Sequence, residues 1–191
     1  MKVVAFNGSP RQGGNTTQML AILQQTLQDE GVQTEEVRVC PGRPRGCLAC
    51  MGCAQNKDRR CTIDSDPVNE WIAKMVEADG IVFASPTYFG SVSSEMKALI
   101  DRAGLVARVN GNLLRRKVGA AVVAVRRGGA ITAHDTLLRA FQINEMVIPG
   151  SLYWNFGVGL RPGDVQEDDE GKENMVNLGQ NMAWLLQRTV D

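Results

Sequence analysis

The chain has 191 residues, a length that suits one α/β domain or one domain with a long insertion. Its hydrophobic content of 43% is enough for a buried core and excludes a globally disordered protein. Lysine and arginine total 21, as do aspartate and glutamate, so the formal net charge of zero gives no bulk attraction to nucleic acid or an anionic membrane.

The start of the sequence resembles neither a signal peptide nor a membrane span. Its apolar run, residues 3–6, is far too short for either. We therefore expect a cytoplasmic protein, in which thiols stay reduced. The five cysteines then need an explanation other than a disulfide framework.

Apolar residues recur with strand and helix periods in alternation along the chain. In order, the predicted elements are strands over residues 2–6, 34–39, 80–84, 118–125 and 146–153, and helices over 15–30, 67–78, 93–103, 132–143 and 173–188. Asn15 is expected to cap the first helix, because Gln18 three residues later completes a capping-box pattern. The five strand–helix repeats predict a parallel sheet with helices on both faces.

The loops after the first, third and fourth predicted strands are the most distinctive. Parallel strands place their carboxyl ends at one edge of the sheet, and ligands bind beyond that edge. We therefore expect residues 8–14, 85–91 and 126–129 to form a single site.

The first of these loops has the composition of an anion site. Its glycines let the backbone approach a ligand closely, and the free N–H groups of the following helix attract negative charge. A phosphate monoester fits this chemistry, whereas the G-x-G-x-x-G and P-loop patterns are absent from the sequence. An ordinary turn before a helix is the alternative. The candidate donors are Ser9, Arg11, Asn15, Thr16 and Thr17.

The second and third loops offer walls and polar groups for a flat ring. Tyr88 and Phe89 can pack against it, while Thr87 and nearby amides can bond to its edge. Gly128 and Gly129 permit close approach to a ring or a sugar chain. The alternative is that these aromatic residues fill the core and that the neighbouring arginines are surface charge.

The long segment 40–66 is rich in Gly, Pro, Arg and Cys and shows no periodicity, which is typical of a functional loop. Cys47, Cys50 and Cys53 are separated by two-residue gaps, and Cys61 follows after seven more residues. Such spacing lets a loop wrap thiolates around one metal centre, and an iron–sulfur cluster takes four. Nearby basic residues would offset the negative charge of that centre; they are Arg43, Arg45, Lys57, Arg59 and Arg60.

Three other interpretations of these cysteines stay open. They are small buried hydrophobes, a tetrahedral zinc site, and a reactive dithiol or regulatory disulfide. Cys40 stands at a strand end and is expected to pack, although it can replace Cys61 as a ligand.

Residues 7–11, 14–16 and 85–90 together resemble the NADPH-dependent FMN reductase family, over roughly residues 2–154. The resemblance implies a flavodoxin-like three-layer α/β/α fold, a five-stranded parallel sheet of order 2-1-3-4-5, non-covalent FMN, and a homodimer or homotetramer. It implies a phosphate site at Ser9, Arg11, Asn15 and Thr16, and a ring site at Pro86, Thr87, Tyr88, Phe89 and Gly90 with Gly128 and Gly129 beside it.

The cysteine pattern resembles the iron–sulfur flavoproteins, a subgroup of that family with a compact four-cysteine motif holding a [4Fe–4S] cluster. The motif maps onto Cys47, Cys50, Cys53 and Cys61, with a longer gap before the last.

We therefore expect one FMN-binding domain over residues 1–191, with a cysteine-rich insert at about 40–66. It would transfer electrons between NAD(P)H or a ferredoxin-type donor and a small-molecule or protein acceptor. The cofactor supplies the redox chemistry, so we assign no catalytic side chain. The alternatives are a non-enzymatic flavin electron carrier and a zinc- or thiol-based redox sensor. Neither nucleic acid nor a membrane is an expected partner.

The single histidine and a cluster of aromatic residues carry two further expectations. His134, the single histidine, is expected to be solvated or to cap a helix. Tyr153, Trp154 and Phe156 form an aromatic cluster that we expect at a subunit interface, over a neighbouring flavin or in the core.

Overall fold

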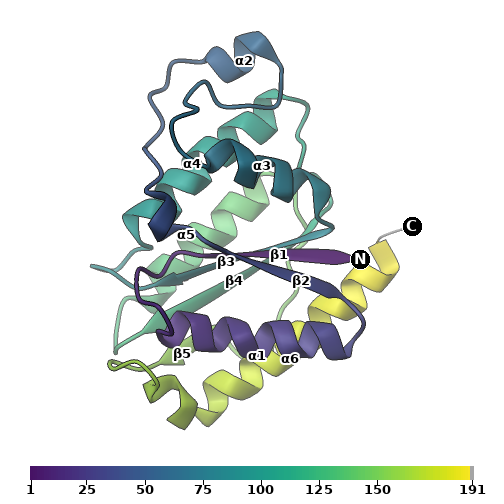
Figure 1. The fold of residues 1–191 in the computed structure, drawn as a ribbon. Helices are drawn as coiled ribbons and strands as arrows, with labels where there is room; N and C mark the ends of the chain where they lie inside the picture. The colour runs from purple at the N-terminus through teal and green to yellow at the C-terminus, as the bar shows by residue number, and fades with distance from the viewer. Residues whose placement is uncertain (190–191) are drawn as a thin grey trace.

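The computed structural model describes residues 1–189, and these residues form a three-layer α/β/α arrangement (Figure 1). The strands are β1 (Lys2–Asn7), β2 (Gln33–Arg38), β3 (Gly80–Pro86), β4 (Val118–Val125) and β5 (Phe156–Val158). All pairings are parallel, and the order β2-β1-β3-β4-β5 confirms the flavodoxin-like sheet.

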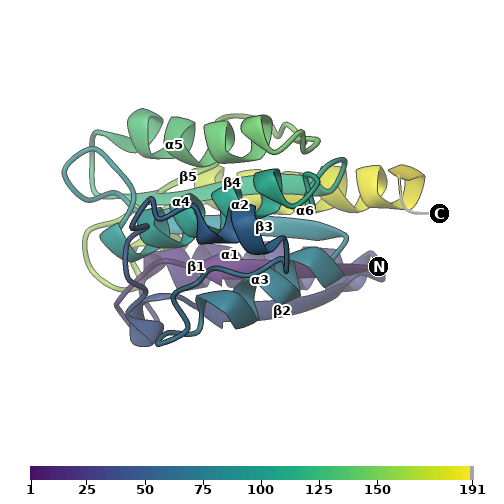
Figure 2. The same cartoon turned by 90° about the horizontal axis from the view of Figure 1, so that it is seen from above.

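Helices cover both faces of this sheet. They are α1 (Asn15–Asp29), α2 (Gly52–Asn56), α3 (Val68–Glu77), α4 (Ser94–Val109), α5 (Ala130–Ile143) and α6 (Asp169–Thr189), with short 3-10 turns η1 (Cys40–Gly42) and η2 (Asp164–Glu167). Helices α1 and α6 lie on one face, and α3, α4 and α5 lie side by side on the other (Figures 1 and 2). The short α2 lies outside these layers and packs on α4.

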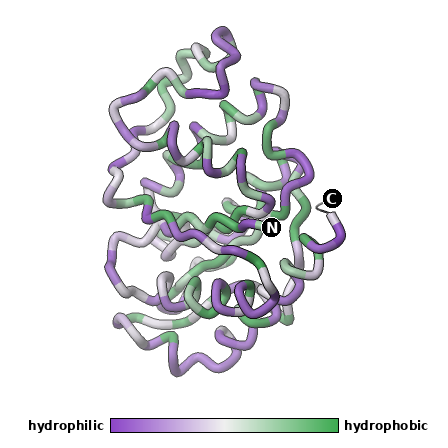
Figure 3. The backbone as a smooth tube through the Cα atoms, turned by 45° about the vertical axis from the view of Figure 1, so that its right-hand side comes forward, coloured by the Kyte–Doolittle hydropathy of each residue, from purple (hydrophilic) through white to green (hydrophobic). Residues whose placement is uncertain are grey.

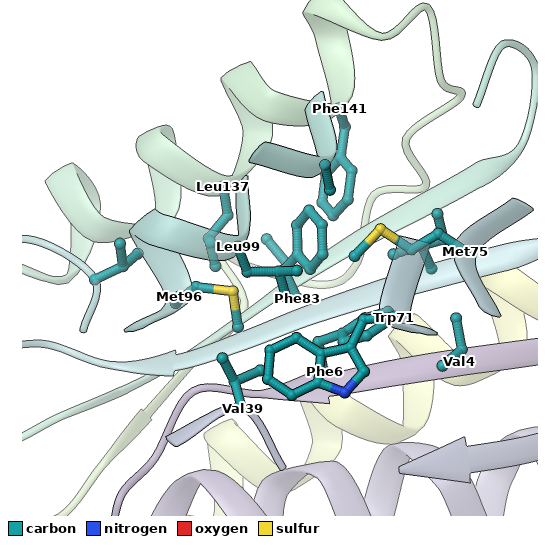
Figure 4. Close-up of a cluster of buried hydrophobic side chains, with 14 of the residues drawn as sticks. Val4, Phe6, Val39, Trp71, Met75, Phe83, Met96, Leu99, Leu137 and Phe141 are labelled. Atoms are coloured by element: carbon teal, nitrogen blue, oxygen red, sulfur yellow. The ribbon is translucent and has the colours of Figure 1, made fainter. Parts of the chain in front are cut away.

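The central strands are buried on both faces, so their side chains feed two separate cores. Val3 and Ala5 of β1 face α1 and α6, whereas Val4 and Phe6 face the other helices. Figure 3 shows hydrophobic runs in strands that cross the middle of the molecule. On the larger core, the rings of Phe83 and Phe141 stack with centroids 4.9 Å apart (Figure 4).

The last strand differs from its prediction. Of residues 146–153, Val147 alone pairs with the sheet, as an isolated bridge to Val118. The chain then leaves the sheet at Pro149, which has no N–H to donate to a ladder. It returns at Asn155, whose carbonyl accepts the Val123 N–H at 2.9 Å. The strand predicted at 146–153 is therefore wrong, and β5 begins ten residues later than its predicted start.

The excursion at residues 148–154 leaves two aromatic side chains outside the core. Tyr153 and Trp154 pack on each other with ring centroids 4.6 Å apart, and they are 55% and 51% exposed. Phe156 instead turns inward, and the ring of His134 meets it edge-on at 5.4 Å. His134 is only 7% exposed, so the expectation of a solvated or capping histidine is wrong.

The start of α1 also differs from its prediction. Gly14 occupies the N-cap position, so no side chain caps this helix. The Asn15 side chain accepts the Gly163 N–H at 3.0 Å instead, because it is turned toward the loop after β5. Gln18 donates to the Gly13 carbonyl rather than completing a capping box.

None of the helices in the described part of the chain has the length and hydropathy of a membrane span.

Candidate functional site

One cleft lies where the strands end at their carboxyl edge. It is lined by the loops after β1, β3, β4 and β5: Ser9, Arg11, Gly14, Asn15, Thr16, Pro86, Thr87, Tyr88, Ala124, Arg126, Gly159 and Leu160. The structure therefore brings the first and second candidate loops into one site. The third loop contributes Arg126, one of its two arginines, for which surface charge is the alternative.

The first loop of the cleft is held in shape by buried polar side chains. Asn7 accepts the Ser9 N–H at 2.9 Å through its Oδ1, while its Nδ2 donates to Thr17 Oγ1 at 2.9 Å. Ser9 Oγ in turn accepts the Arg11 N–H at 3.3 Å. A Cβ at Gly14 would lie 3.1 Å from the Arg11 Cβ, so this approach favours glycine. These contacts fix the loop before any ligand arrives.

The N-terminus of α1 opens into this cleft. Because Gly14 offers no side chain, the N–H groups of the first helical turn have no side-chain cap and can bind an anion. Arg11 adds a guanidinium, which also donates to the Leu160 carbonyl at 3.3 Å. Positive charge and helix amides thus converge at one end of the cleft, which suits a phosphate group.

The other end of the cleft carries an unmet hydrogen-bonding group. The Thr87 N–H donates to the Ala124 carbonyl at 2.8 Å, which ties the loop after β3 to β4. The Thr87 hydroxyl oxygen, however, is buried without a hydrogen-bond partner among residues 1–189. A buried hydroxyl left in this state is unfavourable, and a polar ring edge in the cleft would relieve it.

Five predicted residues lie near this cleft without lining it: Thr17, Phe89, Gly90, Gly128 and Gly129. The loops after β3 and β4 touch where Gly129 meets Gly90, since a Cβ at Gly129 would lie 3.0 Å from the Gly90 Cα. Phe89, at φ 48°, is fully exposed beside them. Thr17 lies behind the first loop as the partner of Asn7.

A second, smaller cavity is lined by all four cysteines predicted as ligands. Cys47, Cys50, Cys53 and Cys61 share it with Arg102 of α4 and with apolar side chains of the insert and of α4. Among residues 1–189, no three His, Cys, Asp or Glu side chains are grouped closely enough to hold a metal ion.

Cys40 does not line this cavity. Its thiol lies 3.2 Å from the Gly8 carbonyl, to which it donates a hydrogen bond. Burial, assisted by the nearby Glu95 carboxylate, raises the pKa of Cys40 to about 11. Cys40 is thus a protonated packing residue below the first loop, as the sequence suggested.

The cysteine loop has an unusual backbone. Ala49 and Met51 adopt left-handed conformations at φ 52° and 58°. The Ala49 N–H donates to the Cys47 sulfur at 3.4 Å, and Cys50 Sγ lies 3.2 Å from the Thr62 hydroxyl. That hydroxyl lowers the pKa of Cys50, whereas burial raises the pKa of Cys53. Of the four cysteines that line the cavity, Cys47 and Cys50 are exposed, Cys61 is half-buried and Cys53 is buried.

Comparison with known proteins identifies the lineage. A family model of NADPH-dependent FMN reductases matches residues 1–160. The chain belongs to the NADPH-dependent FMN reductase family. An iron-sulfur flavoprotein of Methanocaldococcus jannaschii is 39% identical over 193 residues, covering 97% of each chain. An iron-sulfur flavoprotein of Methanosarcina thermophila is 31% identical over 189 residues, covering 98% of this chain and 96% of that protein.

Solved structures agree on the fold of this FMN reductase family member. RosB with bound 8-demethyl-8-formylriboflavin-5'-phosphate has a TM-score of 0.75 at 21% identity, covering 98% of this chain and 79% of that chain. A flavodoxin from the domain Archaea has a TM-score of 0.64 at 14% identity, covering 98% and 99%. The family and the flavodoxin-like fold are thereby confirmed, while the roles of single residues stay predictions.

Sequence reasoning missed part of the FMN reductase cleft. Gly159 and Leu160 line it after β5, but the last strand had been predicted at 146–153. A Cβ at Gly159 would lie 2.5 Å from Asn15 Nδ2, so the loop after β5 packs tightly on the start of α1. The sequence held only a general indication of these two residues. Every parallel strand ends at the same edge of the sheet, so the loop after the last strand also lies at that edge.

Proposed function

We propose that this chain binds FMN in the cleft at the carboxyl edge of its sheet and acts as an FMN-dependent oxidoreductase. One observation carries the proposal: a single cleft joins the loop at residues 9–16 with the loop at residues 86–88. The first loop has the chemistry of a phosphate site and the second that of a ring site. Their separation along the chain makes this convergence a property of the fold.

The residues present fit the two ends of FMN. The amides of the first turn of α1, the Ser9 hydroxyl and the Arg11 guanidinium would bind the phosphate. Pro86, Thr87 and Tyr88 would hold the ring, with the partnerless Thr87 hydroxyl donating to its polar edge. Gly90 and Gly129, packed on each other, would keep side chains away from that edge.

Bound FMN supplies hydride and single-electron transfer, so the chain itself needs only to bind and orient. The buried hydrogen bonds of Asn7 hold the phosphate loop, and the Thr87–Ala124 bond holds the ring loop against β4. No side chain is required to move a proton, and we assign no catalytic residue.

We propose in addition that Cys47, Cys50, Cys53 and Cys61 hold a [4Fe–4S] cluster. Support comes from the cavity that all four share and from the relatives named iron-sulfur flavoproteins. Exposed basic residues of the insert would offset the negative charge of such a cluster. The alternatives are a zinc ion bound by these cysteines and thiols without a ligand. Iron together with acid-labile sulfide would distinguish the cluster from both.

The remaining parts of the proposal concern partners. NAD(P)H or a ferredoxin-type protein would supply electrons, and a small molecule or a protein would accept them, in the cytoplasm. A homodimer or homotetramer is proposed because the paired rings of Tyr153 and Trp154 are half exposed on the surface.

The deciding experiment is anaerobic purification followed by measurement of flavin, iron and sulfide per chain. We expect one FMN per chain, together with iron and sulfide in equal amounts. Protein without flavin absorbance that also fails to bind added FMN would refute the flavin proposal. Zinc without iron would favour a redox sensor. Flavin reduction by a protein donor, without turnover of NAD(P)H and quinones, would indicate an electron carrier.

A further inference from the structure

Arg102 is a buried arginine of α4. Its side chain is 0% exposed, although it stands on α4, most of whose charged residues face solvent. A guanidinium cannot shed its charge in a protein, so burial requires partners for its N–H groups. It donates to Cys61 Sγ at 3.3 Å, the Arg45 carbonyl at 3.2 Å, Asp66 Oδ2 at 2.6 Å and the Ile63 carbonyl at 2.8 Å. All four acceptors belong to the cysteine insert.

Asp66 completes this arrangement at the base of the insert. Its Oδ2 also accepts the Arg45 N–H at 2.9 Å, and its side chain is 4% exposed. Arg45 precedes the four cysteines and Asp66 follows them, so these contacts join two points 21 residues apart in sequence. Arg102 and Asp66 therefore close the cysteine loop at its neck. Holding the ends together in this way removes the entropy cost of closing the loop when a ligand binds.

The Arg102 bond to sulfur reaches the cysteine that lies farthest from the others in sequence. Cys61 comes after α2, and its N–H donates to Asn69 Oδ1 at 2.7 Å. The Asn69 bond fixes the backbone of Cys61, while the Arg102 Nε–H···S bond fixes its sulfur against the cavity. No comparable charged donor contacts Cys47, Cys50 or Cys53 among the described residues.

We propose that Arg102, paired with Asp66, is the positioning residue of the cysteine site: it presents the Cys61 sulfur as the fourth ligand and stabilises the reduced form of the cluster. The inference rests on the proposed cluster. Hydrogen bonds to ligand sulfurs are among the factors that set the potential of an iron–sulfur centre. A donor to sulfur stabilises the more negative, reduced state, so losing it should lower the reduction potential.

A charge-balanced double variant separates the hydrogen bond from simple charge. Arg102→Met with Asp66→Asn removes one positive and one negative charge, so the net charge is unchanged, while the bond to Cys61 is lost together with the other Arg102 bonds at the neck. Redox titration of the anaerobic protein, monitored through the paramagnetic signal of the cluster, should show an equilibrium constant for reduction that is at least tenfold smaller. For a one-electron couple that is a potential lower by about 59 mV. Arg102→Lys keeps the charge but lacks the Nε donor, so it should also lower the potential. It takes the place of the double variant if that protein does not fold.

The matched control is Arg108→Met. Arg108 stands on the same helix about 9 Å farther along its axis, is exposed, and donates to the Ile143 carbonyl away from the thiols. The reduction potential of the cluster in Arg108→Met should equal that in the wild type. A wild-type potential in both Arg102 variants would overturn the proposal.

An iron-free measurement tests the neck independently of the cluster. Amide hydrogen exchange over residues 45–66 should be at least tenfold faster in the double variant than in the wild type, and unchanged in Arg108→Met. Unchanged exchange would overturn the positioning role even if the cluster is present. If the wild type binds no iron, the cluster proposal fails, yet this exchange result still decides whether Arg102 organises the loop.

Discussion

The Asn15 side chain accepts a hydrogen bond from the Gly163 backbone at 3.0 Å, between residues 148 positions apart in sequence. Close by, the Arg11 guanidinium donates to the Leu160 carbonyl. The loop after β5 is therefore fastened to the proposed phosphate loop at two points. A change in either loop should be felt in the other.

Gly159→Ala should weaken both FMN binding and stability. The new Cβ would lie 2.5 Å from Asn15 Nδ2 and 3.0 Å from the Val165 backbone nitrogen, so Asn15 or the loop must move. We expect about a tenfold loss of FMN affinity, or ~1.4 kcal/mol, and a free energy of unfolding lower by about 1–3 kcal/mol. Flavin fluorescence titration and urea unfolding measure the two effects.

Gly150→Ala is the control for that substitution. A Cβ at Gly150 meets no atom within 4 Å, and this glycine lies in the excursion outside the cleft. FMN affinity should stay at the wild-type value there. Unchanged affinity in Gly159→Ala as well would contradict the role given to the loop after β5.

Arg11→Met should weaken FMN binding through the phosphate alone. The guanidinium lies in the cleft beside the uncapped start of α1, where it would pair with the phosphate. A charge-assisted bond at an exposed position suggests a loss of about tenfold, ~1.4 kcal/mol. Riboflavin, which has no phosphate, should bind the variant and the wild type equally.

Arg127→Met supplies the control for charge in general. Arg127 is exposed in the loop after β4 and does not line the cleft. An equal loss of riboflavin and FMN affinity in Arg11→Met would mean that Arg11 contacts the ring or supports the fold instead.

The sheet and most of the cleft follow from local sequence pattern. The apolar runs of β1, β3 and β4 are buried on both faces, and such runs are readable without tertiary information. Once the sheet is parallel, its carboxyl edge gathers the loops after β1, β3 and β4. This reasoning places Ser9, Asn15 and Thr87 at that edge, and all three line the cleft.

The errors share a tertiary cause. The run Met146–Val147–Ile148 has the composition of a strand, but the edge of β4 accepts only a bridge there and then pairs with β5. Arg102 resembles any charged residue of an amphipathic helix, and it is buried because the cysteine insert folds over it. Neither outcome is encoded in the periodicity of its own segment.

Replacing single cysteines should identify the fourth ligand. Cys61→Ser should lose iron, because Cys61 lines the cavity with the other three thiols. Cys40→Ser should retain the wild-type amount, because Cys40 donates to the Gly8 carbonyl outside that cavity. Iron and sulfide assays on anaerobically prepared protein decide the matter. The reverse pattern would make Cys40 the ligand.

The stability of the protein should depend on His134 between neutral and mildly acidic pH. Burial lowers the pKa of His134 below its ordinary 6.5. The unfolded chain therefore takes up this proton at a higher pH than the folded chain does. Stability is full above about pH 6.5, and it is lost as the pH falls from there toward the folded-state pKa, by up to about 1.4 kcal/mol per pH unit.

His134→Leu should remove this pH dependence, since His134 is the single histidine and no other histidine titrates there. Leucine can still pack against Phe156, and the buried Nε2, which lacks a hydrogen-bond partner within residues 1–189, is eliminated. Urea unfolding of both proteins at pH 7.5, 6.5 and 5.5 gives the comparison. The difference in unfolding free energy between variant and wild type should grow as the pH falls. Parallel curves would mean that His134 takes up its proton equally well in the folded and the unfolded chain.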